Sequence, residues 1–147
     1  MLMAKSEFKL GNLTKITKEK ASTSAKTKDA RNATFHITAD TDEILTLTGE
    51  FFEQGWSKGD NEGTMLLAGA KKADGSEIKV AFGFFRTKKL LQEDGLKTFK
   101  ACFDKDASYE EIVNGIEAGK KIQVKRDDYV YPGKSSARAV DTVVWVD

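Results

Sequence analysis

The chain contains one cysteine, one histidine and one proline among its 147 residues, and these shortages exclude several kinds of protein. A single cysteine, Cys102, cannot form a disulfide framework within the chain, which fits a reducing compartment. We expect it to be a small buried side chain rather than a reactive thiol. One histidine and one cysteine cannot supply the usual ligands of a zinc site. The sequence therefore predicts neither a disulfide-stapled secreted domain nor a zinc protein.

Long apolar runs are also missing. Stretches such as residues 65–70 are far shorter than the roughly 20 residues that span a bilayer. Residues 1–7 lack the apolar core of a secretion signal. With 39% hydrophobic and 32% charged residues, the composition is typical of a soluble globular protein. We therefore expect a single domain over residues 1–147, located in the cytoplasm and without a membrane partner.

No catalytic motif withstands a structural test. The segment Gly55–Gly59 matches G-x-S-x-G, but that motif needs a strand before the serine, a helix after it and a later histidine. Here a Gly/Asp/Asn segment follows, and His36 precedes the serine on an expected strand, where we predict a solvent-side position. Glycine-rich phosphate loops are absent, and the acidic turn 40–43 lacks the glycine of an EF-hand. The sequence predicts a protein that is not an enzyme and has no metal or cofactor.

Charge alternates in blocks along the chain, although the net charge is only +1. Residues 1–34 hold eight Lys or Arg against three Asp or Glu, and residues 35–64 hold one against seven. Residues 65–105 hold nine against five, and residues 106–147 hold six against eight. Binding of nucleic acid by bulk attraction needs a basic protein, so any such binding here needs a local stripe of cations.

The first 32 residues are predicted to be a basic, partly mobile segment preceding a core over residues 33–147. Residues 18–28 are small, polar and basic, so they offer nothing to bury and are expected to form a mobile loop or arm. Before them, the apolar residues Phe8, Leu10, Leu13 and Ile16 are consistent with a short edge strand.

Alternation of apolar and polar residues predicts strands over 34–39 and 43–52, with turn chemistry between them. Gly49 within the second strand indicates a bulge or bend. Residues 53–63, rich in Gly, Asp, Asn and Ser, are expected to form a loop with Trp56 at its middle. Residues 64–72 and 76–86 predict a hairpin that turns at Asp74 and Gly75.

One helix is sharply bounded. Ser108 and Glu111 make a capping box, and Gly119 supplies a left-handed stop, which predicts a helix over 109–118. Residues 87–103 fit a helix or a strand equally well. A last hairpin is expected from residue 122 to residue 146, with its turn at Pro132 and Gly133.

The order from Glu43 onward, three strands, a helix and two strands, resembles the OB-fold. We therefore expect a mainly β protein, a small barrel or curved antiparallel sheet that is OB-fold-like, with one short α-helix near 109–118. The resemblance implies a ligand face on the second and third strands and on the loops after the first and fourth.

Aromatic residues interleaved with cations fall on that implied face. Exposed rings stack on bases and Lys or Arg contact phosphates, so we predict a single-stranded DNA- or RNA-binding protein, of a compact, tail-less phage or plasmid type. The predicted contact residues are Trp56, Lys58, Lys71, Lys72, Phe85, Arg86, Lys88, Lys125, Tyr129, Tyr131 and Lys134.

The competing hypothesis is a protein-interaction module, such as an inhibitor, an adaptor or a phage structural subunit. Its acidic segment, residues 40–62, would face a basic protein partner. Trp56 would then be an interface anchor. The final strand could in addition pair with a second copy of the chain in a homo-oligomer.

Overall fold

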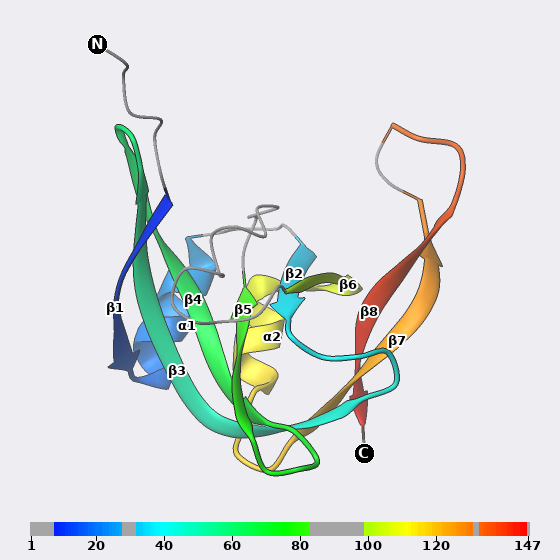
Figure 1. Ribbon diagram of the computed structural model, residues 1–147, viewed down its shortest axis with the longest axis horizontal. Coiled ribbons are helices and arrows are strands. Elements are labelled where there is room, and N and C mark those ends of the chain that lie inside the picture. The colour runs from blue at the N-terminus through cyan, green and yellow to red at the C-terminus, as the bar shows by residue number, and fades with distance from the viewer. Residues whose placement is uncertain (1–7, 28–31, 83–98, 131–132, 147) are drawn as a thin grey trace.

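The computed structural model describes residues 8–27, 32–82, 99–130 and 133–146, and strands dominate it (Figure 1). The strands are β1 (Phe8–Ile16), β2 (Asn32–Ile37), β3 (Ile44–Lys58), β4 (Asn61–Lys71), β5 (Glu77–Phe82), β6 (Lys100–Ser108), β7 (Lys121–Tyr129) and β8 (Arg138–Val146). The helices are α1 (Lys18–Lys26) and α2 (Tyr109–Gly115). The predicted mainly β class is confirmed. Neither helix of the described ranges is long and apolar enough to cross a membrane.

The strands form one curved sheet in the order β1-β3-β4-β5-β2-β6-β8-β7. A further pairing of β3 with β7 brings the hydrogen-bonded circuit back to β3. The described pairings are antiparallel apart from that of β6 with β8. The expected curved antiparallel sheet is confirmed, but it has eight strands rather than five because β1, β2 and β6 are built into it.

A bend in β3 allows this strand to pair with three others, β1, β4 and β7. Gly49 adopts a φ of +83°, and the register with β4 shifts between Leu47 and Phe51. Before the bend β3 pairs with β7, and after it β3 pairs with β1. The bulge predicted at Gly49 is confirmed.

The loop predicted over residues 53–63 is wrong. Strand β3 continues to Lys58 and β4 begins at Asn61, with Gly59 at a φ of +59° in the tight turn between them. Glycines inside these strands suggested a loop, yet their backbones pair normally: Gly55 is opposite Thr64, and Gly63 is opposite Trp56. Trp56 therefore lies on a strand.

Helix α1 replaces the loop or arm predicted over residues 18–28. Thr17 caps it by accepting a hydrogen bond from the backbone N–H of Lys20 at 3.2 Å. Ala21 and Ala25, one turn apart, are the buried residues of the helix. Because the helix is short and buries only two alanines, its composition alone does not indicate a helix.

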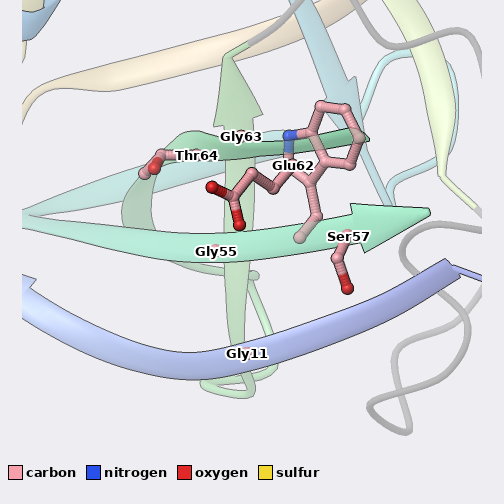
Figure 2. A pocket seen from close by; sticks show the side chains of 7 residues that line it. Gly11, Gly55, Ser57, Glu62, Gly63 and Thr64 are labelled. Carbon is pink, nitrogen blue, oxygen red and sulfur yellow. The ribbon is translucent and has the colours of Figure 1, made fainter. Parts of the chain in front are cut away.

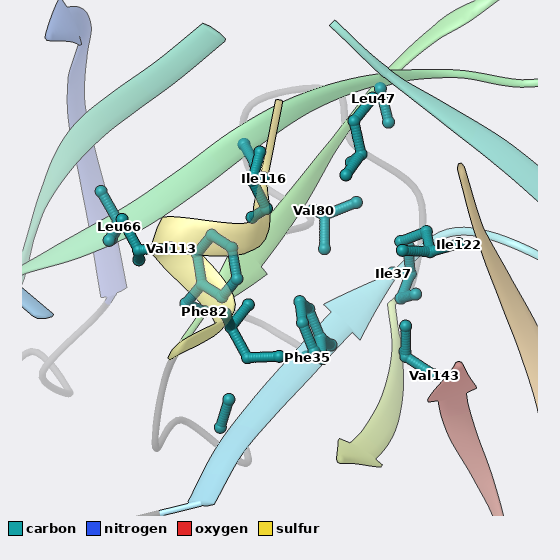
Figure 3. Close-up of a cluster of buried hydrophobic side chains, with 14 of the residues drawn as sticks. Phe35, Ile37, Leu47, Leu66, Val80, Phe82, Val113, Ile116, Ile122 and Val143 are labelled. Atoms are coloured by element: carbon teal, nitrogen blue, oxygen red, sulfur yellow. The ribbon is translucent and has the colours of Figure 1, made fainter. Parts of the chain in front are cut away.

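A buried core fills the inner face of the sheet. Side chains from β2, β3, β5, β7, β8 and α2 converge there, among them Phe35, Leu47, Val80, Val113 and Ile122 (Figure 3). At the start of α2 the N–H of Glu111 donates to the Ser108 hydroxyl at 3.3 Å, as predicted. The helix ends at Gly115, three residues earlier than the sequence suggests.

A second, smaller cluster lies on the opposite face of β3, β4 and β5. It contains Met65, Leu67, Ala81 and Phe99, with Phe52 and Trp56 packed against it. Alternation along each strand separates these residues from their inward-facing neighbours. We call the side of the sheet that carries this cluster the outer face.

His36 and Cys102 are both buried. His36 has Ala81 and Ala101 as its strand partners and is only 7% exposed, so the predicted solvent-side position is wrong. Its partner Ala81 belongs to the second cluster, so His36 lies between two paired strands beside apolar residues. Cys102 is fully buried, as expected, and burial raises the pKa of its thiol to about 12.

Candidate nucleic-acid interface

Two hairpins rise on opposite sides of the molecule, with α2 between them (Figure 1). On one side β3 and β4 pair from Phe51–Ala68 out to Lys58–Asn61, with β1 alongside. On the other, β7 and β8 pair from Lys121–Val146 out to Tyr129–Arg138. We call these the first hairpin and the second hairpin.

The indole of Trp56 lies across the backbone of β4 on the first hairpin. A Cβ atom added to Gly63, its strand partner, would come within 2.7 Å of the ring. Glycine at this position therefore lets the ring rest directly on the strand. Gln54, two residues earlier, donates a hydrogen bond from Nε2 to the Gly11 carbonyl at 3.2 Å and ties β1 to the hairpin.

An open pocket of about 550 Å³ lies beside Trp56 on the same hairpin (Figure 2). Its lining combines Trp56 with three glycines and three polar side chains, namely Gly11, Gly55, Gly63, Ser57, Glu62 and Thr64. Ser57 and Glu62 are strand partners and share one face of the hairpin, whereas Trp56 and Gly63 share the other. Ser57 has strand on both sides, so it does not sit on a strand-to-helix nucleophile turn.

Phe52 and Lys79 extend the aromatic and cationic surface across the outer face. The Lys79 ammonium lies 4.8 Å from the centre of the Phe52 ring, within cation–π range. Neither residue is among the contacts predicted from the sequence. The spacing of Phe52 and Trp56, four residues apart on one strand, is the signal that places both rings on one face.

Two of the predicted phosphate contacts are engaged within the protein. Lys72 pairs with Glu43 at 3.8 Å, and Lys125 pairs with Asp42 at 3.3 Å. Lys71, next to Lys72 at the end of β4, is exposed. Neighbours in sequence therefore differ in how freely they can meet a phosphate.

The acidic segment 40–62 is partly neutralised in space. Besides the two pairs above, Glu50 binds Lys15 at 2.8 Å and Glu53 binds Lys20 at 3.2 Å. The hydrogen bond from Lys15 lowers the pKa of the Glu50 carboxyl. Lys15 and Lys20 of the basic N-terminal segment thus lie against the acidic segment, and this leaves less net negative charge on that surface than the sequence suggests.

The second hairpin carries a ring stack. Tyr129, at the end of β7, stacks on Phe103 of β6. Arg138, the strand partner of Tyr129, and Lys134 are both exposed. Of the other predicted contacts, Lys58 is the last residue of β3, and Phe85, Arg86, Lys88 and Tyr131 lie outside the described residues.

The outer face and the second hairpin both present aromatic rings and cations. Such groups can stack on planar rings and attract anions. The rings are supplied by rigid strands rather than by loops, which fixes their positions. Searches against models of protein families, curated proteins and solved structures found nothing that matches this chain.

Proposed function

We propose that this protein is a cytoplasmic, non-catalytic single-stranded nucleic-acid-binding protein of OB-like architecture. The observation that carries the proposal is the placement of aromatic rings on both projecting hairpins, with Lys79 of β5 over the Phe52 ring and Arg138 opposite Tyr129. Trp56 and Phe52 lie on the first hairpin, and Tyr129 lies on the second. Single-strand binders combine such stacking rings with a cationic track for the backbone.

The order and pairing of the strands support an OB-like architecture. Strands β3 and β4 would correspond to the first two OB strands, and β7 and β8, which follow α2, to the last two. In an OB-fold the ligand lies between the loops that join these pairs. Here the same two connections are the projecting hairpins. The insertion of β2 and β6 between β5 and β8 is a departure from the five-stranded order.

Replacement of Trp56 is the direct test of this function. Base stacking on an exposed ring contributes about 1 to 3 kcal/mol. Trp56→Ala should therefore weaken binding of a fluorescein-labelled (dT)20 roughly 5- to 150-fold, measured by fluorescence anisotropy at low and at physiological salt.

Trp145→Phe is the matched control for that experiment. Trp145 is also partly exposed, at 41%, but it lies at the base of the second hairpin, where it pairs with Ile122 and packs against Gly115 of α2, far along the strands from Tyr129. This variant should bind as the unchanged protein does. Absence of binding by the unchanged protein at low salt would overturn the proposed function.

Lys71 and Lys72 should differ as phosphate contacts. Lys71→Ala should weaken binding and reduce the slope of log K against log salt by about 0.7, the value for one contact with a single strand. Lys72→Ala should leave the slope nearly unchanged, because that ammonium is paired with Glu43. Equal slopes for the two variants would show that the ion pair does not decide which lysine contacts the strand.

A further inference from the structure

The ring pair of Phe103 and Tyr129 differs from the aromatic contacts of the core. Their centroids are 5.0 Å apart and their planes are 5° from parallel. In the core, the planes of Phe35 and Phe82 meet at 53°, and those of Phe82 and Tyr109 at 50°. Both rings of the parallel pair belong to partly exposed residues. A flat stack at the surface is therefore distinct from the tilted packing inside.

The two rings come from strands that are not neighbours. Strand β8 lies between β6 and β7 in the sheet. Phe103 has Thr142 as its partner on β8, and Tyr129 has Arg138. The rings thus converge across β8, with Phe103 coming from the pairing of β6 with β8 and Tyr129 from the outer end of the second hairpin.

On both sides of Tyr129 along the chain, the second hairpin is exposed to solvent. Residues 125–128 of β7 and residues 133–139 are all exposed, so a planar ligand can reach this region without displacing core residues. Arg138 shares the face of Tyr129 because the two are strand partners.

We propose that Phe103 and Tyr129 form a nucleobase platform, on which one base of a single strand stacks as a third ring while Arg138 binds its phosphate. The inference rests on the proposed function and assigns a second, separate site to it. Aromatic faces accept any base, and an arginine guanidinium matches a phosphate through two parallel hydrogen bonds.

Binding of fluorescein-labelled (dT)20 to the full-length chain tests the platform. Tyr129→Leu should weaken binding roughly tenfold, whereas Tyr129→Phe, which keeps the ring, should stay within about threefold of the unchanged protein. Arg138→Ala should weaken binding and lower the salt slope by about 0.7. A (dT)20 carrying one 2-aminopurine should lose fluorescence with the unchanged protein and lose less with Tyr129→Leu.

The outcomes separate this inference from the proposed function. If Trp56→Ala weakens binding but Tyr129→Leu and Arg138→Ala do not, the platform is overturned and the proposed function stands. If the unchanged protein does not bind (dT)20 at low salt, both are overturned. Thermal unfolding identifies a misfolded Tyr129→Leu variant. In that case, unchanged binding by Arg138→Ala would overturn the platform, and weakened binding with a reduced salt slope would support it.

Discussion

Gly49→Ala should destabilise the protein by about 2 to 5 kcal/mol. A left-handed backbone costs a residue with a Cβ about 1 to 2 kcal/mol, and Gly49 has a φ of +83°. The new Cβ would also lie 2.9 Å from the backbone nitrogen of Ala118, and forcing the two segments apart costs about 1 to 3 kcal/mol more. Thermal or denaturant unfolding measures the loss, which corresponds to a decrease in Tm of roughly 5 to 15 °C.

Gly75→Ala provides the control for the Gly49 variant. Gly75 has nearly the same backbone conformation, with a φ of +87°, but nothing lies within 4 Å of its added Cβ. This variant should lose only the conformational part, about 1 to 2 kcal/mol. Equal losses at the two sites would mean that the close approach of β3 to Ala118 contributes nothing to stability.

Acidification should destabilise the protein through His36. Burial lowers the pKa of this imidazole from 6.5 to about 4, and its Nε2 finds no hydrogen-bond partner among the residues that the structure describes. Between these two values the unfolded chain binds a proton that the folded protein does not, so stability falls as the pH falls. The full loss, reached near pH 4, is about 3 kcal/mol.

His36→Leu isolates this contribution from that of the carboxylates. Because the chain has no other histidine, the difference in unfolding free energy between the two proteins should vary with pH only through His36. We expect the unchanged protein to lose about 3 kcal/mol relative to the variant between pH 6.5 and pH 4. Parallel stability profiles in denaturant titrations at several pH values would contradict the buried, neutral state of the imidazole.

Local chemistry made much of this fold predictable. The Asp74-Gly75 turn, the cap at Ser108 and the bend at Gly49 each depend on one or two residues in a distinctive conformation, and all three are confirmed. Helix α1 was missed because its stability depends on tertiary partners. Lys18 reaches the Asn114 carbonyl at 3.0 Å, and no local pattern reveals such a contact.

The site was less predictable than the fold, since its residues are grouped by register. Trp56 could be selected from the sequence as an aromatic residue near cations. The packing of its indole on Gly63, however, follows from the pairing of β3 with β4. Lys72 and Lys125 are as basic in sequence as Lys71. Their partners, Glu43 and Asp42, are identified only once the strands are placed in space.

The closure of β3 on β7 has a kinetic consequence. Ile44 pairs with Gln123, and Thr41 donates a hydrogen bond to Asp141 at a sequence separation of 100 residues. Loop entropy must be lost before such distant contacts form. Topologies dominated by non-local pairing fold in about milliseconds to seconds, rather than in the microseconds of helical bundles. Until these pairings form, the first residues of β3 present unpaired backbone groups, and unpaired strand edges of this kind promote association between folding chains.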